Sequence, residues 1–144
     1  MRQDRATSEL MAARQALAAA EEALSARRRE LADYEATKED RRDKIYDAVI
    51  GRTVSREQID LANEGVARID EEGVLKADNV VRAEAERKDR EAATEVARVN
   101  LNAATKNRMK IEEHRAVWME EVLKAEEART EGELEDFMVR KEEV

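Results

Sequence analysis

The side chains with the greatest capacity for chemistry are one histidine and several adjacent carboxylates. His114 is the only histidine and follows Glu112 and Glu113, a set that could ligate a metal or act as a general base. One imidazole gives too few nitrogen ligands for a typical zinc site, and the residues next to His114 belong to a charged helix. Glu126 and Glu127 form a similar pair among other charged residues. We interpret these groups as solvated side chains and predict no metal, no cofactor and no catalytic residue.

Motifs for common enzymes are missing from the sequence. It has no glycine-rich phosphate loop, no nucleophile elbow and no acidic calcium loop. A reacting group must also be withdrawn from water in a cleft, and the elements expected below do not form one. The sequence therefore predicts a binding protein and not an enzyme.

The composition favours long helices over a thick core. Charged residues make up 43% of the 144 residues and aromatic residues 3%, while proline is absent and glycine occurs four times. The richness in Ala, Leu, Glu and Arg argues against disorder, although a segment that folds on binding is an alternative. Without cysteine there is no disulfide framework, and no apolar run reaches the roughly 20 residues of a membrane span. We expect a soluble intracellular chain.

The charge pattern argues against a nucleic-acid-binding protein. The formal net charge is −8, whereas phosphate contacts require a concentrated basic face. A basic cluster does occur at residues 27–29, but Glu30 and Asp33 lie within about one helical turn of it. We therefore interpret the cluster as part of an ion-paired helix surface.

The first half of the chain carries a coiled-coil pattern. Apolar residues at seven-residue spacing form a ladder in which Lys38 is the polar member: Leu10, Leu17, Leu24, Leu31 and Ile45. The alternate seam positions, three residues on, hold Ala13, Ala20, Arg27, Tyr34, Arg41 and Ala48. Small residues near the amino end would allow a partner helix to approach closely.

A turn is predicted after this first helix. Gly51 suits the left-handed conformation that ends many helices, and Ser55 with Gln58 forms a capping box that begins the next one. Val54 and Ile59 occupy the positions of a hydrophobic staple. An alternative places the turn at Gly65 or Gly73, within residues 65–73, which would make the two arms nearly equal.

The second helix begins with a clear seam and then loses it. Ile59, Ala62, Val66 and Ile69 open the seam, after which Gly73, Lys76, Arg87 and Arg90 weaken it. The apolar stripe is expected to drift to another face, which carries Val74, Val81, Ala85, Ala92, Val96, Val99 and Ala103.

These patterns predict an all-α fold, a long antiparallel two-stranded coiled-coil helical hairpin. We expect one domain over residues 1–144, with a helix at about 4–50, a turn at 51–55 and a helix at about 56–140. A turn there pairs residues whose numbers sum to roughly 105, so that Ile45 meets Asp60 and Leu10 lies near Glu95. Residues beyond about 105 would then extend past the first helix.

The only tryptophan and the only phenylalanine lie in that extension. Trp118 can continue a seam with Ile111 and Val122, or anchor a partner, since aromatic residues dominate interface energies. Leu134, Phe137 and Met138 form a smaller apolar cluster near the acidic end. Our candidate partner-binding residues are Ile59, Ala62, Val66, Ile69, Trp118, Val122, Leu134 and Phe137.

Residues 34–71 resemble the YscO/HrpO family of type III secretion proteins, the injectisome counterparts of flagellar FliJ. The matching positions are Tyr34, Ile45 with Tyr46, Gly51, Val54 with Ser55, Ile59 with Asp60, and then Val66, Ala67, Ile69 and Glu71. The carboxyl-terminal stretch Glu133–Phe137 followed by Arg140 is also similar to this group. Thr37, Lys38 and Ala62 depart from the family pattern, which leaves the contact surface open.

The resemblance implies a bacterial cytoplasmic stalk, associated peripherally with the secretion apparatus at the inner membrane and linked to virulence. Its paired termini would enter the pore of a hexameric secretion ATPase, and its hairpin end would face the cytoplasmic domain of the export gate. The family's gate contact would fall on Ile59, Ala62, Val66 and Ile69, and secretion chaperones are further partners. We expect no nucleic-acid partner, no membrane insertion and a monomer in the free state. A generic structural coiled coil, a homodimeric scaffold or adaptor, and a secretion chaperone remain alternatives.

Overall fold

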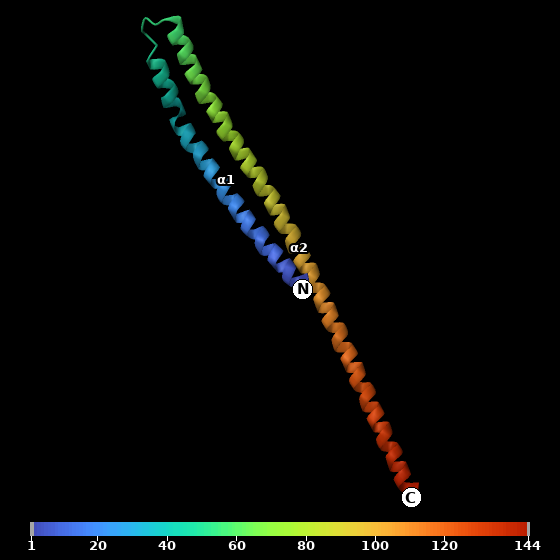
Figure 1. The fold of residues 1–144 in the computed structure, drawn as a ribbon. Helices are drawn as coiled ribbons and strands as arrows, with labels where there is room; N and C mark the ends of the chain where they lie inside the picture. The colour runs from blue at the N-terminus through green and yellow to red at the C-terminus, as the bar shows by residue number, and fades with distance from the viewer. Residues whose placement is uncertain (1, 144) are drawn as a thin grey trace. The chain divides into compact units, whose positions relative to one another are not determined.

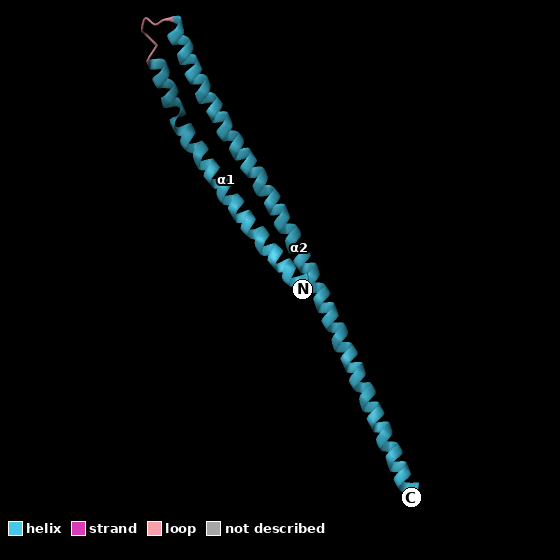
Figure 2. Cartoon of the chain, in the orientation of Figure 1, coloured by secondary structure: helices cyan, strands magenta, loops and turns pink. Residues whose placement is uncertain are grey.

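The computed structural model describes residues 2–143, which form two α-helices and one connection (Figure 1 and Figure 2). Helix α1 spans Arg2–Asp47 and helix α2 spans Arg56–Glu143. This architecture confirms the all-α helical hairpin. Helix α1 ends three residues before the expected position 50. The chain divides into a hairpin unit, Ser8–Arg98, and a distal unit made of Met1–Thr7 and Val99–Val144.

The connection at residues 48–55 contains the helix stop and the helix start that the sequence indicates. The amides of Val49 and Ile50 donate to the carbonyl of Tyr46, and Gly51 then takes a φ of 73°. At the other end, the Gln58 amide donates to Ser55 Oγ (3.2 Å) and the Ser55 amide donates to Gln58 Oε1 (2.9 Å). The predicted capping box is therefore present, and its reciprocal bonds satisfy two amides at the start of α2. Gly65 and Gly73 lie within α2, so neither is the turn.

In the hairpin unit, α1 and the first part of α2 run side by side in opposite directions from this connection (Figure 1). Their shared seam is thin, and its buried side chains are Leu10, Ala20, Leu24, Tyr34, Val66, Ile69 and Ala97. Leu17, Leu31 and Ile45 of the ladder are half-buried, as is Lys38. The ladder of the first helix thus faces α2, as the seven-residue spacing predicts.

Two glycines of α2 set how the two helices align. A Cβ on Gly73 would lie 3.2 Å from Tyr34 Cε1, and one on Gly65 would lie 3.2 Å from Ile45 Cδ1. The absence of these side chains makes room for the large residues of α1. Contacting pairs such as Tyr34 with Gly73 and Ala13 with Thr94 have residue numbers that sum to 107.

The expected alignment of Ile45 with Asp60 is therefore wrong by a few residues, whereas Leu10 does lie near Glu95 as expected. Ile45 lies against Gly65, and the observed register places Leu10 opposite Ala97. The expectation came from the centre of the turn alone, whereas the fit of bulky side chains over glycine decides the alignment.

The expected drift of the apolar stripe in α2 is also wrong. Val74, Val81 and Val96 are between 59% and 66% exposed. The face toward α1 keeps strict heptad spacing, and its half-buried members after Ile69 are Gly73, Lys76, Val80, Ala83, Arg87 and Thr94. Long polar side chains are tolerated there because their aliphatic stems cover the seam while their charged ends reach water.

In the distal unit, the first turn of α1 packs against α2. Gln3 Nε2 donates to Thr105 Oγ1 (3.4 Å), and Arg108 Nη1 donates to Gln3 Oε1. Ala6 is buried, and Leu101 and Ala104 are half-buried. The side chains of α2 from Lys106 to Glu142 are exposed, with Val122 half-buried as the exception.

Candidate partner-binding surfaces

The groups considered for chemistry lie on exposed helix surface. His114, Glu112 and Glu113 are all exposed, and Glu112 accepts a hydrogen bond from Arg108 Nε (3.0 Å). Within residues 2–143, no group of three or more His, Asp or Glu side chains is arranged to hold a metal ion. The geometry of these residues therefore suggests ion pairing along the helix rather than ligand binding.

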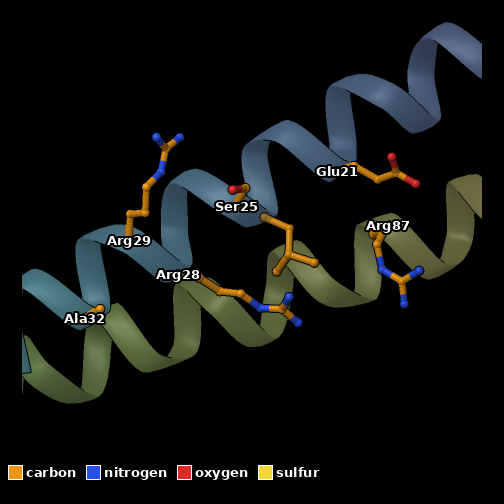
Figure 3. A pocket seen from close by; sticks show the side chains of 7 residues that line it. Glu21, Ser25, Arg28, Arg29, Ala32 and Arg87 are labelled. Carbon is orange, nitrogen blue, oxygen red and sulfur yellow. The ribbon is translucent and has the colours of Figure 1, made fainter.

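The basic cluster at residues 27–29 does not converge on one centre. Arg28 and Arg29 line a shallow hollow with Glu21, Leu24 and Arg87, and the two α1 arginines point in different directions (Figure 3). Arg27 pairs with Glu30 (3.2 Å), and Arg87 pairs with Glu91 (2.9 Å). A phosphate site would need several donors aimed at one point, so this hollow does not qualify.

Ion pairs also cross the hairpin near its turn. Lys38 Nζ and Arg42 Nη1 lie 3.5 and 3.9 Å from Asp70 Oδ1. Along α2, the hydrogen bond from Arg98 lowers the pKa of Glu95 below its ordinary value. Glu95 and Arg98 are exposed and the groups around Asp70 are only half-buried, so these ion pairs contribute little to stability and mainly leave the helix surfaces polar.

The candidate residues at the start of α2 divide into buried and exposed members. Val66 and Ile69 are 7% and 9% exposed because they pack against α1, and Ala62 is half-buried. Ile59 is 44% exposed. The most accessible apolar side chains at this end are Ile50 and Leu61, at 68% and 66%, which the sequence analysis did not select. We call Ile50, Ile59 and Leu61 the tip surface.

Leu61 could not be found from the heptad pattern, because that pattern marks the residues that face α1. The signal for Leu61 is instead its position, because it is a leucine that lies outside the seam and close to a turn.

The candidate residues of the distal unit are accessible, but they do not share one face. Trp118 is 61% exposed and Val122 is half-buried, and both occupy heptad positions that continue the seam of α2. Leu134 and Phe137 are 56% and 65% exposed and lie outside those positions. The structure thus places a seam-like stripe around Trp118 and a separate apolar cluster nearer the end of α2.

No helix within residues 2–143 is long and apolar enough to cross a membrane. Searches of curated proteins and of solved structures give no significant match. The family model described as type III secretion protein YscO matches residues 1–140, nearly the whole chain, and confirms the resemblance found from Tyr34, Gly51 and their neighbours. The chain belongs to the YscO family of type III secretion proteins.

Proposed function

We propose that this protein is the stalk of a type III secretion apparatus, which inserts into the hexameric secretion ATPase, couples it to the export gate and stimulates protein export. It acts in the bacterial cytoplasm, next to the inner-membrane apparatus, by binding and not by catalysis. The family supports a secretion role, and the helical hairpin is a form suited to a stalk.

The observation that carries the proposal is the presence of two exposed apolar surfaces on different units. The tip surface belongs to the hairpin unit, and the stripe around Trp118 belongs to the distal unit. An exposed tryptophan on a highly charged chain is a strong candidate for an interface anchor. A coupling protein needs separate contacts for its two partners, and these surfaces provide them.

In this proposal, the distal unit enters the ATPase, and the tip surface contacts the cytoplasmic domain of the export gate. Val66 and Ile69 support the tip from inside the hairpin, while Ile59 and Leu61 make the contact. Secretion chaperones are further partners of the exposed helix surfaces in this proposal.

The first test is a binding and turnover assay with the purified cognate ATPase. We expect the full chain to bind the hexamer and raise its ATP turnover, and Trp118→Ala to weaken binding by about tenfold or more. Val117→Ala is the matched control, because Val117 is 54% exposed on another face of the same helix turn. Absence of any effect of the wild-type chain on binding and turnover would refute the ATPase part of the proposal.

A separate assay tests the gate contact. Leu61→Glu should abolish binding to the cytoplasmic domain of the gate without reducing helix content, because Leu61 lies outside the seam. Arg68→Glu, an exposed position on the next turns of α2, controls for added negative charge. Equal loss of binding in both variants would indicate a charge effect rather than a contact at Leu61.

A further inference from the structure

The seam of α2 continues past the part that α1 covers. In the distal unit, the contacts of Gln3 reach Thr105 and Arg108, and Ala6 is buried. The same heptad spacing then continues along α2 through Ile111, Arg115, Trp118, Val122 and Ala125, which we call the free seam. Ile111 and Trp118 are each 61% exposed. The free seam therefore has the spacing of one half of a coiled-coil interface, and it continues the heptad positions of α2 that face α1.

The charges on this segment favour a second copy of the same helix. Residues 108–125 contain four basic residues, Arg108, Lys110, Arg115 and Lys124, and four acidic ones, Glu112, Glu113, Glu120 and Glu121. Two such segments carry no net charge and do not repel one another as a whole. The following residues, 126–136, hold six acidic side chains and one basic side chain.

That acidic stretch selects the direction of pairing. A parallel pair would place the two acidic stretches side by side, whereas an antiparallel pair places them at opposite ends. Antiparallel pairing is also the arrangement in the hairpin unit of this chain (Figure 1).

We propose that a second copy of this chain binds the free seam in antiparallel orientation, with Ile111 against Val122 of the second copy and Trp118 against Arg115 of the second copy. This register pairs apolar with apolar residues and places a guanidinium beside each indole ring. The hairpin seam already uses such contacts, since Arg41 and Lys76 lie 5.6 and 5.7 Å from the centroid of the Tyr34 ring. In this register, a single substitution changes the interface twice, because the pair has two-fold symmetry.

The proposal departs from the monomer that the sequence leads us to expect. That expectation accompanied the family resemblance, and a homodimer was the alternative to it; the heptad positions of α2 that continue beyond α1 favour the homodimer. If the proposed function holds, self-pairing and ATPase binding compete for Trp118, and the dimer is a form that cannot yet engage the ATPase.

The first experiment uses the full chain and its single tryptophan. Sedimentation equilibrium should show a monomer–dimer equilibrium, and the Trp118 emission should shift to the blue as concentration rises, since pairing withdraws the indole from water. Ile111→Lys should abolish both effects, because it places a cation in the seam of each copy. Val117→Lys, with similar exposure outside the seam, should leave both effects unchanged.

The second experiment tests the relative orientation of the two paired helices. Because the sequence has no native cysteine, every disulfide formed must involve an introduced cysteine. Chains carrying Ile111→Cys and chains carrying Val122→Cys should form a disulfide-linked heterodimer when mixed under mild oxidation, far faster than either variant alone. Fast homodimers of the Val122→Cys variant alone would show parallel pairing and overturn the proposed geometry. A wild-type chain that stays monomeric at hundreds of micromolar, with no cross-linking in the mixture, would overturn self-pairing and leave the seam to a different partner. None of these results depends on the ATPase.

Discussion

Among single residues, Tyr34 makes several specific contacts with α2 in the hairpin unit. Its hydroxyl donates to the carbonyl of Ile69, and its ring lies against the backbone of Gly73. Arg41 and Lys76 flank the ring. The sequence identifies Tyr34 as a seam residue and as a family position, but its contacts with residues 69–76 depend on the register between the helices.

Replacing Gly73 by a larger residue should destabilise the hairpin. In Gly73→Val, the new side chain must displace the Tyr34 ring, and overpacking of this kind costs about 1–3 kcal/mol. The free energy of unfolding, from urea titration followed by circular dichroism, measures the effect. Gly132→Val is the control, since nothing lies within 4 Å of a Cβ at Gly132. Equal stability of the two variants would show that Gly73 does not set the register.

Removing the Tyr34 hydroxyl should have a smaller effect. Tyr34→Phe loses a buried hydrogen bond while keeping the ring, and we expect a loss of about 1 kcal/mol. Tyr46 is half-buried, and its hydroxyl takes part in none of the hydrogen bonds of the described residues. Tyr46→Phe should therefore change the free energy of unfolding little. If the two variants unfold at the same urea concentration, the bond to Ile69 contributes nothing.

At the scale of the elements, the ends of the helices follow local rules. Gly51 has positive φ, and the Ser55–Gln58 capping box begins α2 within the same few residues. These signals depend on neighbouring residues and on no tertiary contact. For this reason the sequence alone favours a turn at Gly51 over one at Gly65 or Gly73.

The capping box makes a direct prediction about α2. Ser55→Ala should lower the free energy of unfolding by about 1 kcal/mol, because the Gln58 amide loses its acceptor. Ser25→Ala, an exposed serine inside α1, should be neutral or slightly stabilising because alanine is the better helix former. A Ser55→Ala variant as stable as Ser25→Ala would contradict the role of the cap.

The face of α2 that packs against α1 differs from the face expected from the sequence. Val74, Val81 and Val96 look like core residues by type, yet they are exposed. Lys76 and Arg87 look like surface residues, yet they are half-buried in the seam. Helix α1 can cover only one stripe of α2, and a fixed heptad register selects that stripe whatever its residues are.

At the scale of the whole molecule, the two units differ in how much tertiary support their helices have. The hairpin unit pairs two helices, whereas α2 beyond Arg115 has no described residue of α1 against it. Isolated helices are marginally stable in water, and local opening is easiest where few apolar contacts exist.

Amide hydrogen exchange should therefore be strongly uneven. In dilute solution, amides of residues 10–45 and 62–97 should exchange slowly, and those of residues 116–140 should exchange much faster. Mass spectrometry of peptides after timed exchange measures this, and Ile111→Lys keeps the chain from self-pairing. Equal protection of both regions in that variant would contradict the difference in support.

The sequence by itself determined the helical class, the position of the turn, the face of α1 that forms the seam and the family resemblance. Each of these depends on residues close together in the chain or on a regular spacing. The tertiary structure decided the register, the seam of α2 and the exposure of each candidate residue. In the structure, Val66 and Ile69 are buried, whereas Leu61, Ile50 and Trp118 are exposed. These outcomes depend on how Tyr34 and Ile45 fit over Gly73 and Gly65, contacts between residues that are distant in the sequence.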